Sequence, residues 1–334
     1  MFAGYPGALL TRREIAVVVP TYRRPDLLRR CMEALCAQDI EPQRYEIVVC
    51  DDGPDEATRA LVESIAAREA SRGLAVHYLA VTATQGPAGA RNAGWRAAHA
   101  PNIAFTDDDT IPQPNWLRAG LASLADAQAA AGRVVVPLQD VPTDYELDAS
   151  GLERAEFVTA NVFVQREALL AVGGFDERFT SAWREDSDLQ FSLLSIGVNV
   201  ARADDAVVVH PVRPAHWGVS LSQQRKSRFE ALLFRKHPSF YRERIGARPP
   251  VLYYVILIGL LVTLMALAAG QGAVAAAAAL VWLGGTAWFC ARRLRATRRD
   301  ARHVLEMAWT SLWIPFLSIF WRLNGAVRYR VWFL

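Results

Sequence analysis

The stretch Ile15-Ala16-Val17-Val18-Val19-Pro20 decides the fold, because it is apolar at every position and stops at a turn residue. A strand with both faces covered reads as such a continuous run, whereas a half-exposed strand alternates apolar and polar residues. The segment 25–35 that follows carries its apolar side chains at helical spacing: Leu27, Leu28, Cys31, Met32 and Leu35. Together the two segments predict a buried strand and a helix that packs on it.

The alternation of strand and helix continues beyond this pair. It predicts strands over 45–50, 74–81 and 102–106, with helices over 54–72 and 89–99. Less regular elements follow, namely strands over 133–137, 157–164 and 206–209 and helices over 166–172, 186–196 and 220–236. We expect an α/β fold, a doubly wound and mostly parallel sheet with helices on both faces. Ligands of such sheets bind beyond the carboxyl ends of the strands.

Two apolar segments near the C-terminus predict a membrane hairpin. Residues 251–269 and 273–290 carry no charge, and each is close to the roughly 20 residues that a spanning helix needs. Six arginines follow at once: Arg292, Arg293, Arg295, Arg298, Arg299 and Arg302. The positive-inside rule places that loop in the cytoplasm. Because a hairpin returns the chain to its starting side, we expect a multi-pass protein of the plasma membrane (the bacterial inner membrane) with a cytoplasmic N-terminal domain.

The start of the chain agrees with that orientation, since no apolar run follows a basic N-terminus and no secretory signal is predicted. The segment 304–321 allows two interpretations. It is apolar, but it contains Glu306, Pro315 and three tryptophans, which prefer the headgroup level. If it crossed the membrane, the basic tail after it would lie outside, against the charge rule. This favours an interfacial or re-entrant helix over a third span.

Composition argues against other classes of protein. The 334 residues are 52% hydrophobic, yet the net charge is only +3. The arginine block directly follows an apolar segment, where membrane orientation explains it, so no nucleic-acid partner is expected. The four cysteines have no zinc-ligand spacing with a histidine nearby.

Three adjacent carboxylates, Asp107-Asp108-Asp109, end the strand predicted over 102–106. Carboxylates so close together repel one another unless a cation or bound donors neutralise them. Hard oxygen ligands suit Mg²⁺ or Mn²⁺, and either ion can bridge phosphates. The motif alone is equally compatible with a solvated acidic turn.

Four further motifs stand in a fixed order around these aspartates. Pro20-Thr21-Tyr22-Arg23 ends the first strand, and Asp51-Asp52-Gly53 ends the second. Gly86-Pro87-Ala88-Gly89-Ala90-Arg91-Asn92 precedes the aspartates, and Trp183-Arg184-Glu185-Asp186-Ser187-Asp188-Leu189 comes about 75 residues after them. In this order, on an alternating β/α pattern, the set resembles glycosyltransferase family 2, the inverting enzymes with the GT-A fold. The resemblance covers about residues 14–240.

This resemblance implies a site for a nucleotide-sugar donor. Thr21, Tyr22 and Arg23 would line the pocket of the nucleotide base and ribose, and Asp52 would recognise the base, commonly uracil. The family's donor-facing helix matches Arg91 and Asn92, of which Arg91 would pair with a phosphate.

The resemblance also implies metal ligands. Asp107 and Asp109 match the first and third positions of the family's Asp-x-Asp motif, with Asp108 between them at the donor. Asp107 would contact ribose or metal, and Asp109 would bind Mg²⁺ or Mn²⁺ on the diphosphate. His210 follows the strand 206–209, where some family members place a further metal ligand. The alternative is a histidine that ends a strand without any ligand.

A general base is implied as well, because Asp186 matches the aspartate of the family's Glu-Asp motif. An acceptor hydroxyl is a poor nucleophile, and a carboxylate within hydrogen-bond reach can remove its proton during attack. Glu185 would orient the acceptor or the loop, although acids also suit any helix N-terminus. Asn161 and Trp183 are expected to shape the acceptor side.

The expected protein is therefore an inverting, metal-dependent glycosyltransferase that uses a nucleotide-diphosphate sugar, a UDP-sugar first. Its catalytic domain would cover 1–245, with a nucleotide-binding half at 14–110 and an acceptor half at 111–245, before a membrane region at 246–334. A membrane location suggests a lipid or lipid-linked acceptor. The alternatives are a polyprenyl-phosphate glycosyltransferase and a non-catalytic scaffold that binds sugar nucleotides. The family's processive synthases carry a Gln-x-x-Arg-Trp motif that Gln223-Gln224-Arg225-Lys226 does not match, which favours a single transfer.

Overall fold

In the computed structural model, which describes residues 13–246 and 248–333, the chain folds as two compact units. The first unit holds the chain up to Val135 together with Ala155–Pro211. The second holds Val136–Arg154 and the chain from Val212 onward. Residues 1–12, where no secretory signal is predicted, lie outside the described residues. The division into a catalytic part ending at residue 245 and a membrane part stays a prediction.

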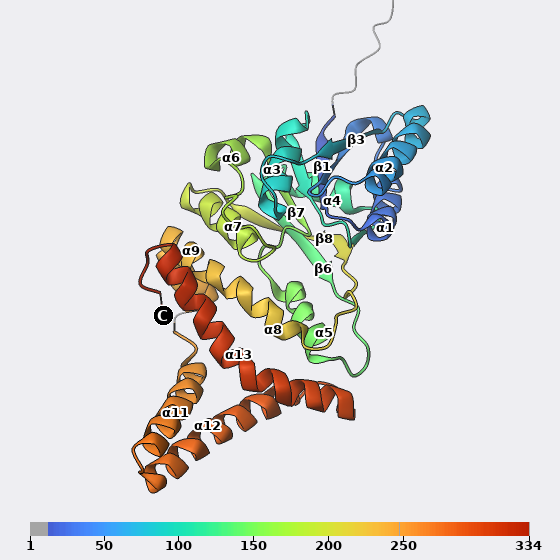
Figure 1. Cartoon of the computed structure of the whole chain (residues 1–334). Helices are drawn as coiled ribbons and strands as arrows, with labels where there is room; N and C mark the ends of the chain where they lie inside the picture. Colours follow the sequence, from blue (N-terminus) through green and yellow to red (C-terminus); the bar gives the residue numbers. More distant parts are fainter. Residues whose placement is uncertain (1–12, 247, 334) are drawn as a thin grey trace, which may run out of the picture. The chain divides into compact units, whose positions relative to one another are not determined.

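The first unit is built on one eight-stranded sheet with the strand order β3-β2-β1-β4-β7-β6-β8-β5 (Figure 1). Its strands are β1 Ile15–Thr21, β2 Tyr45–Asp51, β3 Ala75–Ala80, β4 Asn102–Phe105, β5 Ile111–Pro112, β6 Ala129–Val135, β7 Val162–Gln165 and β8 Val200–Val209. The neighbours β3, β2, β1 and β4 run parallel, as do β6 and β8. β7 is antiparallel to β4 and β6, and β5 is antiparallel to β8. The predicted mostly parallel α/β sheet is thus confirmed.

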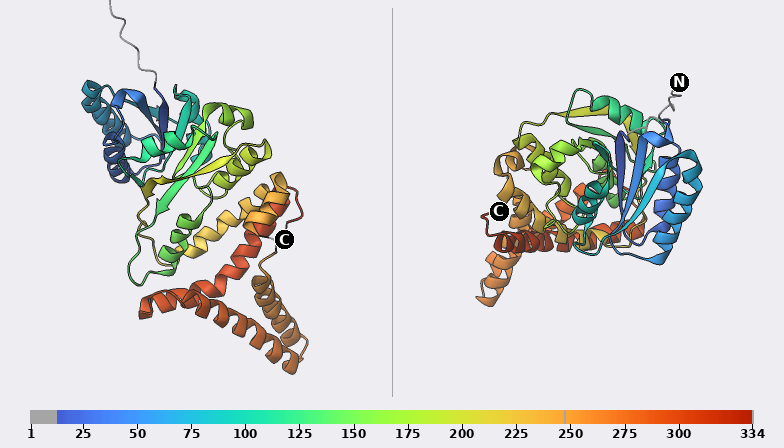
Figure 2. Two further views of the ribbon diagram at one scale, coloured as in Figure 1. Left: turned by 180° about the vertical axis from the view of Figure 1, so that it is seen from behind. Right: turned by 90° about the horizontal axis from the view of Figure 1, so that it is seen from above.

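Helices cover both faces of this sheet, as the right-hand view of Figure 2 shows for α2 and α3. The helices of the unit are α1 Pro25–Cys36, α2 Glu56–Glu69, α3 Pro87–Ala97, α4 Trp116–Ser123, α6 Arg166–Val172 and α7 Glu185–Ser195. Every residue of β1 is buried, which is why its sequence is apolar throughout. On one face, Val18 and Phe105 share a core with Trp95 of α3 and Leu189 of α7.

Gly94 allows α3 to lie close to the sheet. A Cβ atom there would overlap with Cys50 Sγ in β2 and with Val18 in β1. The close approach holds the helix that carries Arg91 directly above the ends of these strands.

Several predicted elements differ from the structure. The strand predicted over 206–209 is only the end of the longer β8, which begins at Val200. β6 begins at Ala129 rather than at 133, because its alanines pair with both β7 and β8 although alanine has a low β propensity. The predicted strand 157–164 is confined to β7. The predicted helix 220–236 is divided into α8 Val219–Gln223, a 3₁₀ turn η4 Gln224–Ser227 and α9 Arg228–Lys236.

The second unit is helical. Besides α8 and α9 it contains α5 Asp144–Ala149, η3 Ser150–Arg154, α10 Pro238–Phe240, η5 Tyr241–Ile245, α11 Val251–Ala268, α12 Gly272–Arg293 and α13 Ala301–Arg328. α11 and α12 pack as the predicted hairpin, and a Cβ atom at Gly259 would lie 3.1 Å from the backbone nitrogen of Trp282. By length and composition, α11, α12 and α13 are each able to cross a membrane.

Candidate active site

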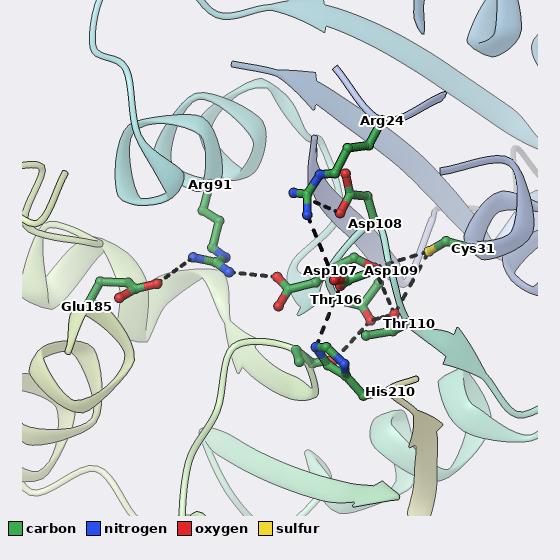
Figure 3. A network of polar contacts seen from close by, with 11 residues as sticks. Arg24, Cys31, Arg91, Thr106, Asp107, Asp108, Asp109, Thr110, Glu185 and His210 are labelled. Carbon is green, nitrogen blue, oxygen red and sulfur yellow. Dashed lines mark hydrogen bonds and ion pairs between the residues drawn. The ribbon is translucent and has the colours of Figure 1, made fainter. Parts of the chain in front are cut away.

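The candidate site lies where β1 and β4 end side by side. The N–H of Thr106 donates to the carbonyl of Val18 at 3.3 Å, after which the chain leaves the sheet as Asp107-Asp108-Asp109. The N–H of Thr110 then donates to the carbonyl of Asp107, closing a turn that presents the three carboxylates. Figure 3 shows this acidic turn with the side chains that surround it.

Asp107, Asp109 and His210 come together as a group able to hold a metal ion. One ligand atom from each lies within 4.8 Å of the others. His210 reaches the aspartates because the short strand β5 pairs with β8, so that Ile111 lies opposite Val209, the residue before His210. His210 Nε2 is 3.6 Å from Asp109 Oδ1.

The chemistry of this group fits a divalent cation. Two carboxylates and an imidazole are ligands that Mn²⁺ accepts, while Mg²⁺ prefers oxygen alone. Asp109 is only 5% exposed, and burying a carboxylate is unfavourable unless positive charge lies beside it. The structure therefore assembles the three predicted ligands in a setting suited to a cation.

Asp108 has a different environment from its neighbours. It is 1% exposed, and its Oδ2 accepts a hydrogen bond of 2.7 Å from the hydroxyl of Thr21. Its Oδ1 lies 3.1 Å from Arg24 Nη2, and burial raises the pKa of this carboxyl to about 7. Asp108 and Thr21, both predicted at the donor, thus bind each other and join β1 to the acidic turn.

Arg24 is a site residue that the sequence analysis missed. Besides Asp108, its guanidinium reaches Asp109 at 3.8 Å, so it places positive charge at the acidic turn. The neighbouring Arg23, which was predicted instead, has a φ of 51° and stacks its guanidinium 5.3 Å from the ring of Tyr22. Nothing in two adjacent arginines indicates which one faces the acids, and the backbone conformation decides it.

Arg91 joins the acidic turn to the start of α7. Its Nη2 donates to Asp107 Oδ1 at 2.7 Å, and its Nη1 donates to Glu185 Oε1 at 3.2 Å (Figure 3). Its side chain is 3% exposed, and the guanidinium lies 5.8 Å from the ring centre of Phe175. Arg91, predicted as a phosphate ligand, therefore holds two protein carboxylates that are far apart in sequence.

Glu185 and Asp186 open α7 directly after a strained residue. Arg184 has a φ of 73°, a left-handed conformation that is uncommon outside glycine and recurs at functional sites. Asp186 Oδ1 accepts the N–H of Ser187 at 2.6 Å. Burial raises the pKa of Asp186, and burial next to Asp186 raises that of Glu185 to about 7. A carboxylate with a raised pKa is a stronger base at neutral pH.

These raised pKa values predict an acid limb in the pH–rate profile. A base works only when deprotonated, so kcat/KM should fall about tenfold per pH unit below the apparent pKa of the Glu185–Asp186 pair. That limb should lie clearly above the ordinary aspartate value of 3.8. Initial rates from pH 4 to 9 at saturating metal would measure it. Donor binding over the same range is the control, and a rate that stays flat below pH 5 contradicts the prediction.

Two residues predicted to bind the nucleotide, Tyr22 and Asp52, follow the ends of β1 and β2 and are called here the nucleotide edge. Tyr22 is 48% exposed, and its ring lies so close over Gly53 that any larger residue at 53 would overlap with it. Both carboxylate oxygens of Asp52 accept the N–H of Gly86, at 2.9 and 2.8 Å, and burial raises the pKa of Asp52. Asp52 thus fixes the turn before α3, while Tyr22 presents an open aromatic face.

The side chains of Asn92 and Asn161, both expected at the site, are hydrogen-bonded to other groups of the protein. Asn92 is 1% exposed and hydrogen-bonds the backbone N–H and carbonyl of Phe175, the indole of Trp95 and Glu177. We therefore propose that Asn92 holds the loop before α7 instead of touching the donor. Asn161 is fully buried and its amide is hydrogen-bonded on both ends within the protein, and its role in shaping the acceptor side stays a prediction.

Known families and proteins match the sequence of this chain. The chain matches the family model of glycosyl transferase family 2 over residues 16–175 and that of glycosyl transferase family group 2 over residues 102–322. It is similar to validoxylamine A glucosyltransferase of Streptomyces hygroscopicus subsp. limoneus, with 27% identity over 73% of this chain and 61% of that protein. Pre-mycofactocin glycosyltransferase of Mycobacterium tuberculosis is 26% identical over 92% of this chain and 64% of that protein. The chain thus spans less than two thirds of these relatives.

Among solved structures, the mannosyltransferase PcManGT of Pyrobaculum calidifontis, in complex with GDP-Man and Mn²⁺, has a similar fold. Its TM-score is 0.56 at 20% identity, over 93% of this chain and 87% of that one. A likeness at this identity concerns the fold alone. It confirms the predicted GT-A-type architecture.

Proposed function

Because the chain belongs to glycosyltransferase family 2, we propose that it is an inverting glycosyltransferase that moves a sugar from a nucleotide-diphosphate donor to an acceptor hydroxyl. The observation that carries the proposal is the Arg91 bridge, whose two ends are Asp107 of the metal-binding group and Glu185 of the α7 start. The bridge joins the metal-binding group to the start of α7, where the proposed base Asp186 follows Glu185. A UDP-sugar is the first donor to test.

In the proposed donor complex, Asp107, Asp109 and His210 would hold Mg²⁺ or Mn²⁺. When bound, the cation neutralises the negative charge that develops on the leaving diphosphate. Tyr22 offers its exposed ring to the nucleotide base, where stacking is available to any base. The fixed turn between Asp52 and Gly86 would border the same pocket.

The chemical step is proposed to use Asp186 as general base. Its carboxylate accepts the proton of the acceptor hydroxyl while the acceptor oxygen bonds to the anomeric carbon and the bond from that carbon to the diphosphate oxygen breaks. A single displacement of this kind inverts the anomeric centre. The hydrogen bond from Ser187 and the start of α7 orient the carboxylate for this role. Glu185 serves as the anchor that Arg91 holds.

We further propose that the acceptor is a lipid or a lipid-linked sugar at the cytoplasmic face of the membrane. The apolar helices α11 and α12 support this, because they would keep the enzyme where such acceptors are found. The relatives described above act, by their names, on validoxylamine A and pre-mycofactocin, so these two compounds belong in the same activity panel, together with soluble acceptors. Strictly lipid-dependent turnover would support the proposal, whereas turnover of soluble acceptors alone would contradict it.

Calorimetric titration of a nucleotide-diphosphate panel into detergent-purified protein, with and without Mn²⁺, tests the donor site. We expect one nucleotide to bind only with metal, and Asp109→Ala to abolish that binding because it removes a buried ligand. Asp126→Ala, at an exposed acid of the same unit, is the matched control and should bind like the natural protein.

The outcomes separate the alternatives. If no nucleotide binds to well-folded protein, the donor site is wrong. If a nucleotide binds with metal but no acceptor in a broad panel is glycosylated, the scaffold interpretation replaces the enzyme. If Asp109→Ala binds as well as the natural protein, the ligand assignment is wrong even though the nucleotide is right.

A further inference from the structure

The long helix α13 has two faces of opposite character. One face carries large apolar side chains at helical spacing that are exposed in the second unit, called here the aromatic stripe: Leu305, Trp309, Trp313, Phe320, Leu323 and Val327. The opposite face is buried against neighbouring helices and carries both polar and apolar residues: His303, Met307, Thr310, Ser311, Ile314 and Ser318. Figure 1 shows α13 running beside α8 and α9.

Both ends of α13 contact the charged segment 218–235. Near its start, Glu306 Oε1 accepts the backbone N–H of Gly218 at 2.6 Å. At its end, a Cβ atom on Gly325 would overlap with the backbone of Arg228, so the two segments touch closely. Just after the helix, the carbonyl of Tyr329 accepts a hydrogen bond of 2.7 Å from Arg235 Nη1.

The middle of α13 is held by the polar end of α12. Arg293, the last residue of α12, donates through Nη1 to Thr310 Oγ1 at 2.7 Å and to Ser311 Oγ at 3.1 Å. Its Nη2 forms an ion pair of 2.6 Å with Asp144 of α5. Residues 310–311 therefore lie at the level where the proposed span α12 ends.

These contacts are incompatible with α13 crossing a bilayer. A helix of 28 residues is about 42 Å long, so the ends of a spanning α13 would lie on opposite sides of a core about 30 Å thick. Yet both ends touch the segment 218–235, which precedes the first span and is itself too charged to cross. From Ser311 to the next charge, Arg322, only ten residues remain, about half of what a span requires.

We propose that α13 lies in the plane of the membrane, with the aromatic stripe inserted into the interface of the leaflet on the side of residues 218–235. The partner is a lipid surface with anionic headgroups, because arginines flank the stripe at both ends: Arg298, Arg299 and Arg302 before it, and Arg328 and Arg330 after it. Tryptophan prefers this level, and an amphipathic helix buries its apolar face about 5–10 Å deep. The surface is continuous with the hairpin α11–α12, which packs on α13.

Spin-label depth in vesicles of phosphatidylethanolamine and phosphatidylglycerol tests the proposal in the full chain. Single cysteines would replace Leu305, Trp313, Phe320 and Val327, in a background in which the four native cysteines are changed to serine or alanine. We expect four similar, shallow depths, with a label at Ile258, in the middle of α11, clearly deeper. A steady change of about 1.5 Å per residue, about 33 Å in total from 305 to 327, would mean that α13 crosses.

Sided labelling with a membrane-impermeant maleimide gives a second, independent readout. Arg330→Cys should react from the same side as Glu243→Cys, before the first span, and from the side opposite to Gln271→Cys at the tip of the hairpin. Reaction of Arg330→Cys on the side of Gln271→Cys overturns the proposal. So would stripe labels that have no contact with lipid but couple strongly between protomers, which would make the stripe an interface between two copies of the chain.

Discussion

Replacing Asp186 with asparagine should lower kcat by about 10²–10⁴-fold, the usual contribution of a general base, while the donor still binds with metal. Asparagine keeps the shape of the side chain and can still accept the N–H of Ser187, but its amide cannot take a proton at neutral pH. Because Asp186 belongs to neither the metal-binding group nor the nucleotide edge, binding should change little. Steady-state rates together with calorimetry of the nucleotide would separate the two effects.

Two companion variants make this result specific. Asp204→Asn, at an exposed acid paired with Arg202, should retain full activity. Glu185→Gln removes the charge that Arg91 holds, and it should lower activity through misplacement of α7 without matching the loss in Asp186→Asn. Full activity of Asp186→Asn on a hydroxyl acceptor means that another group is the base. Unchanged activity on a lipid phosphate would instead favour a polyprenyl-phosphate glycosyltransferase, since a phosphate acceptor needs no base.

Replacing Arg91 with methionine should destabilise the first unit by about 3–5 kcal/mol, because it leaves Asp107 and Glu185 without their shared cation. For a unit of this size that corresponds to a fall in the melting temperature of roughly 6 °C or more. Thermal unfolding of the detergent-purified protein would measure it. Arg96→Met, on the exposed side of the same helix α3, removes a surface pair with Glu177 and a contact with the ring of Trp95, and should change stability much less than Arg91→Met.

The pH dependence distinguishes a lost charge from lost packing in Arg91→Met. Without the guanidinium, the pKa of Glu185 rises above about 7. The pKa of Asp107, which Arg91 helps to hold below its ordinary value against the opposing effect of burial, rises as well, so both groups become neutral more readily as the pH falls. The stability difference from the natural protein should therefore be largest at alkaline pH, where both groups are ionised in both proteins. It should shrink as the pH falls towards 7, because Glu185 of the variant takes up its proton above the value of about 7 at which the natural protein does so. A difference that is constant with pH would mean that packing against Phe175, and not charge, is what Arg91 supplies.

Local patterns predicted the sheet well where burial is complete. β1, β2 and β4 are largely apolar because both of their faces are covered, so the sequence indicates them almost to the residue. The structure departs from the prediction where packing overrides propensity, as in the alanines of β6 between two partner strands. The break between α8 and α9 coincides with seven consecutive polar residues, 222–228, which interrupt the amphipathic pattern on which the single helix 220–236 was predicted.

For the candidate site, the sequence by itself determined which chemical groups are available: the aspartates after β4, the histidine after β8 and the acids that open α7. It could do so because strand ends and helix starts are local features, and short motifs mark them. Only the tertiary structure decided how these groups are paired. Arg24 rather than Arg23 reaches the acids, Asn92 is used within the protein, and Arg91 links residues 107 and 185. Such pairings depend on contacts between segments far apart in the chain, and no local pattern records the distance between two side chains across a fold.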